Sequence, residues 1–171
     1  MSSRSIISAV ISFVLYILVQ VLLLKNFVLF NTTFCFLYVG FLLLLSLETG
    51  PILLMIIAFC AGLTVDIFYD TPGINASASV LIAFLRPHWL SMITPRGGYE
   101  EISIPSIKNV DVIWFTIYSL PLIFIHHFAM FYLESGGFSM FFFTFLKVFT
   151  STLLTFFIII LTQYLFYKRT T

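Results

Sequence analysis

The chain has a long run of apolar residues near its N-terminus. From Ile6 to Leu24 it contains no charged side chain, and Gln20 is the one amide within the run. A helix needs about 20 mostly apolar residues to cross the hydrocarbon of a bilayer. The following residues, Lys25-Asn26-Phe27, are not the small-residue cleavage site of a signal peptide. We therefore expect a retained membrane-spanning helix here.

The composition extends this interpretation to the whole chain. Of the 171 residues, 61% are hydrophobic and only 9% are charged, whereas soluble domains have about 25% charged residues. So few charged residues exclude a soluble enzyme and a disordered segment. The net charge of only +1 also excludes a nucleic-acid binder with a basic face. The apolar runs are continuous rather than alternating, which favours a helical bundle over a β-barrel.

Six apolar segments qualify, or nearly qualify, as membrane-spanning helices. Residues 34–47 form the shortest segment, and at 1.5 Å per residue they would reach only about 21 Å as a helix. The fold class is therefore an all-α polytopic membrane protein, and residues 1–171 form one integral membrane domain. The predicted spans are about 6–24, 34–47, 51–69, 74–93, 112–133 and 139–166.

The positions of Lys and Arg predict the orientation in the membrane. With six spans, the two ends of the chain lie on one side together with the loop of residues 94–111. The loops on the opposite side contain Lys25 as their one basic residue. Basic residues gather on the cytoplasmic side of membrane proteins, so both termini are expected there. The basic residues on the predicted cytoplasmic side are Arg4, Arg96, Lys108, Lys168 and Arg169.

Three ionisable residues fall within or beside the spans, where a charge costs about 2.5–3.5 kcal/mol and needs a partner. Asp66 is expected either to accept hydrogen bonds from the start of the fourth helix, or to pair with a basic residue, or to reach water. Lys147 either extends to the membrane interface or pairs with Asp66 or Glu134. Arg86 is expected to mark the cytoplasmic interface.

No arrangement of residues indicates catalysis, a metal site or a cofactor. His126 and His127 are adjacent, so on a helix they point about 100° apart, whereas metal-binding pairs need i, i+3 or i, i+4 spacing. Packing or interhelical hydrogen bonding is the expected role of both. Glu100-Glu101 is read as a loop charge cluster rather than as the glutamate pair of an intramembrane protease. The chain is therefore predicted not to be an enzyme.

The third and fourth helices contain a distinctive pair of sequence elements. Gly62-Leu63-Thr64-Val65-Asp66-Ile67-Phe68 is followed shortly by Pro72-Gly73-Ile74-Asn75-Ala76. In these elements, and in its length and number of spans, the chain resembles the bacterial rod shape-determining protein MreD family. The stretch from Leu85-Arg86-Pro87 to Glu100 is similar to one branch of that family. Gly62, Asp66, Gly73, Asn75, Arg86 and Lys147 are the candidate structural or partner-binding residues.

The resemblance implies a non-enzymatic scaffold in the inner membrane, within the machinery that elongates rod-shaped cells and builds peptidoglycan. The implied partners are the transmembrane helix of MreC, the actin-like MreB, and the elongation transpeptidase and glycosyltransferase, with no nucleic acid. Residues 94–111 are the expected cytoplasmic surface for MreB or lipid headgroups. Small residues such as Ala58 and Gly62 either dock a partner helix or pack inside the bundle.

The MreD fold is also similar to the six-helix substrate-binding subunits of energy-coupling-factor transporters. This similarity keeps open an alternative function, a vitamin-like small-molecule-binding subunit of a transporter. Such a subunit needs convergent polar groups in the outer half of the bundle and loops that close over the ligand.

Overall fold

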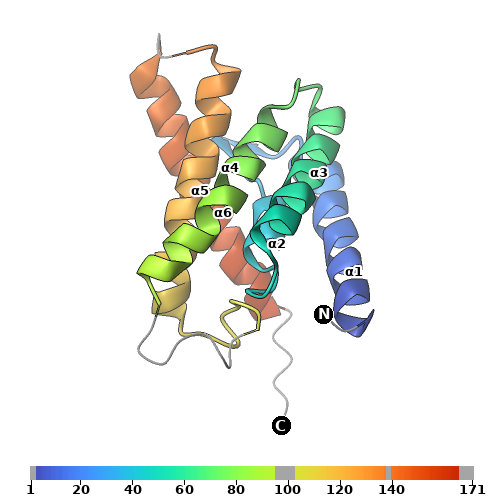
Figure 1. Cartoon of the computed structure of the whole chain (residues 1–171). Coiled ribbons are helices and arrows are strands. Elements are labelled where there is room, and N and C mark those ends of the chain that lie inside the picture. The colour runs from blue at the N-terminus through green and yellow to red at the C-terminus, as the bar shows by residue number, and fades with distance from the viewer. Residues whose placement is uncertain (1–2, 95–102, 138–139, 166–171) are drawn as a thin grey trace.

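The computed structural model describes residues 3–94, 103–137 and 140–165. The described chain is mostly helical (Figure 1). Helix α1 covers Ser3–Val19 and continues as one π-helical turn, η1, over Gln20–Leu24. A short hairpin follows, formed by β1 (Val28–Leu29) and β2 (Thr33–Phe34). The remaining helices are α2 (Tyr38–Leu43), α3 (Pro51–Tyr69), α4 (Ile74–Met92), α5 (Val112–Glu134) and α6 (Phe141–Leu165).

Four helical segments of the described chain are long and apolar enough to cross a membrane. They are Ile7–Leu24, Pro51–Tyr69, Val112–Glu134 and Phe141–Leu165. These segments expose many large apolar side chains, among them Leu22 on η1, Ile52 on α3, Ile113 on α5 and Phe142 on α6. The chain is thus a mostly helical protein with four candidate membrane-spanning helices.

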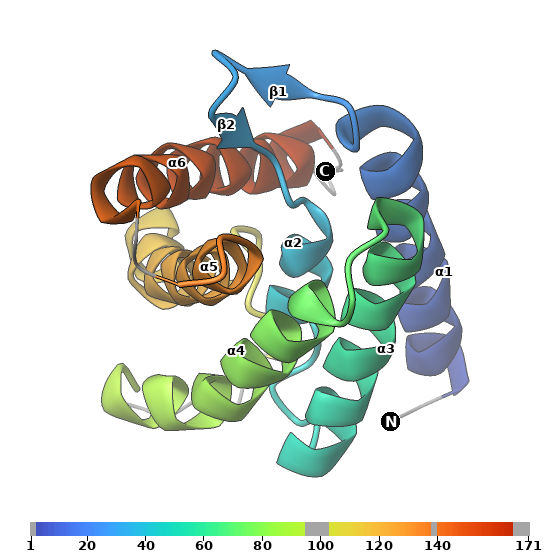
Figure 2. The same ribbon diagram turned by 90° about the horizontal axis from the view of Figure 1, so that it is seen from above.

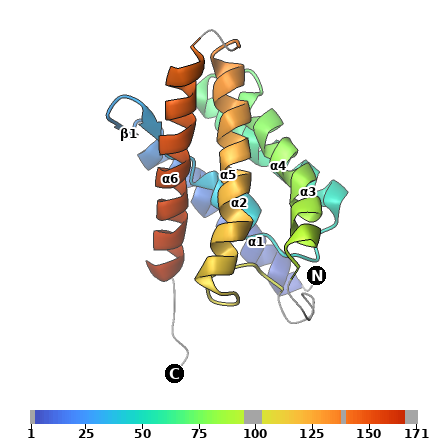
Figure 3. The ribbon, with the colours of Figure 1, turned by 90° about the vertical axis from the view of Figure 1, so that its left-hand side faces the viewer.

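The bundle is arranged around α2. Seen along the bundle, α2 lies at the centre, with α1, α3, α4, α5 and α6 around it (Figure 2). Helix α1 begins, and α6 ends, at the same end of the bundle (Figures 1 and 3). The β1–β2 hairpin and the α3–α4 and α5–α6 turns lie towards the other end, which we call the hairpin end.

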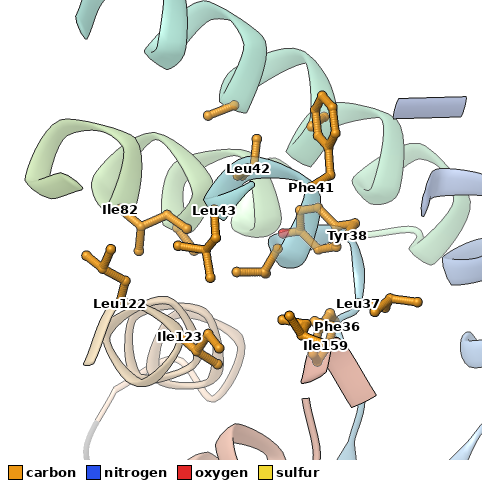
Figure 4. Close-up of a cluster of buried hydrophobic side chains, with 14 of the residues drawn as sticks. Phe36, Leu37, Tyr38, Phe41, Leu42, Leu43, Ile82, Leu122, Ile123 and Ile159 are labelled. Carbon is orange, nitrogen blue, oxygen red and sulfur yellow. The ribbon is translucent and has the colours of Figure 1, made fainter. Parts of the chain in front are cut away.

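The prediction of a second helix over residues 34–47 is wrong. The helix in this stretch has only six residues, Tyr38–Leu43, and at 1.5 Å per residue six residues cover about 9 Å. All six are buried, and three residues that belong to no helix or strand, 35–37, separate them from β2. Figure 4 shows Leu43 beside Ile82 of α4, with Leu122 and Ile123 of α5 near them. Non-helical backbone is tolerated at membrane depth where protein encloses it, and here the other helices do so.

Helices α3 and α4 approach each other closely at Gly62. A Cβ atom on Gly62 would lie 2.5 Å from the Cα and 2.6 Å from the backbone N of Ala76. Ala58 and Ala61 on α3 and Ala83 on α4 are also buried. These four small residues therefore pack inside the bundle, and docking of a partner helix on Gly62 is excluded by its burial.

We expect Gly62→Ala to destabilise the protein, because even a methyl group would overlap the backbone of α4. Overpacking of this kind costs about 1–3 kcal/mol, which should lower the melting temperature of the purified protein in mild detergent. Gly50→Ala is the matched control, since no heavy atom lies within 4 Å of its Cβ position and its φ is −57°. Equal melting temperatures for the two variants would contradict the close α3–α4 contact.

Candidate functional site

Asp66 joins the end of α3 to the beginning of α4. Its carboxylate is buried, with 2% of the residue exposed. Asp66 Oδ1 accepts from the backbone N of Asn75 at 3.0 Å, and Oδ2 accepts from that of Ala76 at 2.9 Å. Asn75 Nδ2 and the Thr71 hydroxyl also donate to Oδ1. The prediction that Asp66 accepts hydrogen bonds from the start of the fourth helix is confirmed, and the negative charge suits the positive end of the α4 dipole.

Gly73 makes the turn before α4 possible. It is the N-cap residue of this helix and has a φ of 82°, which favours glycine because other side chains clash in that conformation. The two sequence elements singled out above, Gly62–Phe68 and Pro72–Ala76, therefore form one structural unit. We call this unit the α3–α4 joint.

The outer side of the α3–α4 joint is hollowed. A groove of about 700 Å³ lies between the two helices at the hairpin end, next to the Asp66 carboxylate and the 71–73 turn. Its lining is mostly apolar and includes small residues at the start of α4. Its lining includes Phe59, Leu63 and Ile67 from α3 and Ala76, Ser77 and Val80 from α4.

Towards the hairpin end, side chains from other elements satisfy the backbone of residues 34–47, which we call the central segment. The backbone N of Phe34 donates to Ser151 Oγ at 2.9 Å, and that of Phe36 donates to Thr155 Oγ1 at 3.0 Å. The side-chain amide of Gln20 donates to the carbonyl of Cys35 at 3.0 Å and accepts from the backbone N of Tyr38 at 3.4 Å. These contacts replace the hydrogen bonds that a continuous helix would supply.

Polar side chains from α4 and α5 converge on Tyr38 in the interior. The Tyr38 hydroxyl lies 2.8 Å from His126 Nε2, 3.1 Å from Ser79 Oγ and 3.4 Å from Asn75 Oδ1. His127 instead contacts the carbonyl of Ile123 at 2.8 Å and Thr155 Oγ1 at 3.2 Å. The prediction that both histidines serve packing and interhelical hydrogen bonding is confirmed.

The prediction that Arg86 marks the membrane interface is wrong, since only 3% of the residue is exposed. Its guanidinium donates to the Tyr118 hydroxyl at 2.6 Å and to the carbonyls of Leu43 and Leu45. The Tyr118 hydroxyl donates to the carbonyl of Leu43 at 2.8 Å. The last carbonyls of a helix have no partner within it. The guanidinium of Arg86 supplies donors to the carbonyls at the end of α2 and is therefore held inside the bundle.

Lys147 lies near the hairpin end of the bundle and forms an ion pair with Glu134. Its Nζ is 3.1 Å from Glu134 Oε2, which confirms one of the two pairings considered from the sequence. The same ammonium lies 4.8 Å from the ring centre of Phe34 and 4.5 Å from that of Phe131. The two cation–π contacts and the Glu134 carboxylate together compensate the positive charge of Lys147 on the apolar helix α6.

The structure brings together four of the six candidate residues. Gly62, Asp66, Gly73 and Asn75 all belong to the α3–α4 joint, while Arg86 and Lys147 act elsewhere in the bundle. Sequence reasoning missed the residues that hold the central segment. One signal was present on α6, where Ser151 and Thr155 are four residues apart and therefore share a face of the helix. The residues missed are Gln20, Tyr38, Tyr118, Ser151 and Thr155.

These features define a mostly helical protein with four candidate membrane-spanning helices, whose interior polar groups hydrogen bond mainly to the chain itself. Across residues 3–94, 103–137 and 140–165, no three His, Cys, Asp or Glu side chains gather as metal ligands would. The Glu100-Glu101 pair lies outside the described residues. Comparisons with protein-family models, with curated proteins and with solved structures found no match.

We expect Asp66→Asn to weaken the α3–α4 joint. The substitution removes the negative charge at the start of α4 and turns one acceptor into a donor that faces a backbone N–H. Leaving a buried donor unsatisfied costs about 1–3 kcal/mol, which is measurable as a lower midpoint of unfolding when SDS is titrated into the detergent-solubilised protein.

Asp70→Asn is the matched control for Asp66→Asn. Asp70 is exposed and adopts a φ of 56°, a conformation that asparagine also tolerates. Its midpoint should stay close to that of the wild type. An equal loss of stability in both variants would mean that the general loss of negative charge, and not the cap on α4, is responsible.

Proposed function

We propose that this chain is a non-enzymatic scaffold subunit of a bacterial cell-elongation complex, as its resemblance to the MreD family implies. In this role it binds the transmembrane helix of MreC and other membrane partners, and so influences cell shape and peptidoglycan synthesis. The observation that supports the proposal best is the α3–α4 joint. The two sequence elements of the resemblance meet there in one unit, and a groove opens beside it on the lipid-facing surface.

The proposed topology has six passes through the inner membrane, with both termini in the cytoplasm. The four long apolar helices account for four passes. Helix α4 and the central segment supply the other two, the central segment as a buried and mostly non-helical pass. An even number of passes agrees with α1 beginning and α6 ending at one end of the bundle (Figure 3).

A scaffold of this kind would act through its lateral surface. Between helices in lipid, close packing of complementary shapes drives association. The groove offers a hollow of about 700 Å³ whose large side chains come from α3 and whose small ones come from α4. We propose that a single partner helix lies along this groove. The predicted contact of residues 94–111 with MreB stays a prediction, and residues 95–102 of it lie outside the described chain.

The alternative function, a small-molecule-binding subunit of a transporter, has one observation in its favour. Asn75, Ser79 and His126 converge on one point in the half of the bundle near the hairpin end. At that point stands the hydroxyl of Tyr38, which is itself fully buried and hydrogen bonds to these groups. The chain thus fills with its own side chain the place that a ligand would occupy, and we therefore favour the scaffold.

Affinity purification of the tagged protein from native bacterial membranes tests the proposed function. We expect MreC and the elongation transpeptidase to copurify, as identified by mass spectrometry. Ser77→Trp should reduce MreC recovery several-fold, because Ser77 is exposed within the groove and a bulky side chain there would fill it.

Ile113→Trp is the control for Ser77→Trp, since Ile113 is 70% exposed on α5, outside the groove. This variant should recover MreC at the wild-type level. Copurification of an ATPase module in place of elongation proteins would overturn the proposed scaffold function. It would favour the alternative, a small-molecule-binding subunit of a transporter. If Ser77→Trp left MreC recovery unchanged, MreC would bind to a surface other than the groove.

A further inference from the structure

The β1–β2 hairpin has a strained residue at its tip. The backbone N of Thr32 donates to the carbonyl of Leu29 at 3.1 Å, which closes a turn with Phe30 and Asn31 in its two central positions. Both have positive φ, 51° for Phe30 and 57° for Asn31, as in a type I′ turn. The strand register pairs Leu29 with Thr33, so residues 30–32 form the loop, and the bulky side chain of Phe30 is an outlier at its positive φ.

Packing within the described chain does not compensate this strain. Phe30 is 92% exposed, the largest exposed fraction among the large apolar side chains of the described residues. Phe27 and Val28, on the strand that leads to the turn, are also exposed. A strained residue persists where something over-determines it. For Phe30, the strand pairing and the turn hydrogen bond hold the backbone, while the side chain stays open to a contact beyond the described residues.

Two lysines mark the depth of the hairpin in the membrane. Lys25, just before β1, donates to the carbonyl of Phe68 at the end of α3, and its ammonium lies 5.9 Å from the ring centre of Tyr69. Lys147 lies over the ring of Phe34, the last residue of β2, and pairs with Glu134. Charged groups settle at the interface between hydrocarbon and water. The base of the hairpin therefore lies at this boundary.

The hairpin extends sideways from the bundle at that level. Figure 2 shows it at the periphery, between the end of η1 and α6. The neighbouring surfaces on both sides are exposed and apolar, with Leu22 and Leu23 on η1 and Leu146 on α6. The apolar side chains of the hairpin are thus continuous with the lipid-facing surface of the bundle.

We propose that the β1–β2 hairpin is a lateral membrane anchor whose Phe30 tip inserts into the boundary between headgroups and acyl chains. Its occupant is lipid of the leaflet at the hairpin end. The ring of Phe30 is 92% exposed, and its burial among acyl chains would stabilise the inserted hairpin. This anchor would operate in the isolated protein, so it does not depend on the scaffold role.

Spin labelling of the purified full-length protein in lipid vesicles tests the anchor. The parent is Cys60→Ala, because Cys60 is exposed, while Cys35 is buried and should take up no label. A nitroxide is attached at Phe30→Cys and, as a control, at Ser135→Cys on the exposed α5–α6 turn. The vesicles contain phosphatidylethanolamine with a minority of phosphatidylglycerol. Power saturation then compares collisions with oxygen, which concentrates in lipid, and with a water-soluble nickel chelate.

We expect the label at position 30 to be more accessible to oxygen than to nickel, and the label at position 135 to show the reverse. A label at Asn31→Cys should fall between them, since Asn31 is the polar neighbour in the same turn. Equal nickel accessibility at positions 30 and 135 would overturn the proposal. So would a label at position 30 that is nickel-accessible in vesicles and becomes shielded only in native membranes, because a protein partner would then cover the tip.

Discussion

Backbone N–H and C=O groups inside hydrocarbon must be hydrogen bonded by the protein, because no water is present to replace a missing partner. This requirement governs the centre of the bundle. The central segment is mostly not helical, and the side chains of Gln20, Ser151 and Thr155 satisfy its backbone towards the hairpin end. Arg86 and Tyr118 satisfy the carbonyls at the end of α2. The positions of η1, α4, α5 and α6 around α2 follow from these contacts.

The same requirement bears on function. Polar groups such as His127, Ser151 and Asp66 have defined partners within the chain, so they hold the framework of the bundle together. What the molecule presents outward is a lateral surface of apolar helices, hollowed beside the α3–α4 joint. A protein of this design is suited to binding other membrane segments, which is the basis of the scaffold proposal.

Most of the helices could be predicted from the sequence, because long apolar runs and Pro or Gly turns are local signals. The contact of Asp66 with the start of α4 could also be predicted, since a buried acid needs donors and a helix N-terminus nearby offers them. The central segment could not, because its composition is as apolar as that of a spanning helix. Its shape depends on side chains 15 to 119 positions away. Arg86 was misplaced for the same reason, since its partners are the carbonyls of that segment.

Hydrogen exchange at single backbone amides in lipid nanodiscs tests the account most directly, with the wild type compared with Thr155→Val. If the Thr155 hydroxyl holds the amide of Phe36, its loss should speed exchange at Phe36 about tenfold or more, which corresponds to roughly 1.4 kcal/mol. Thr150→Val, which removes a hydroxyl bonded within its own helix, should leave that rate unchanged. Unchanged exchange at Phe36 in Thr155→Val would show that a continuous helix, and not side chains of other elements, satisfies this backbone.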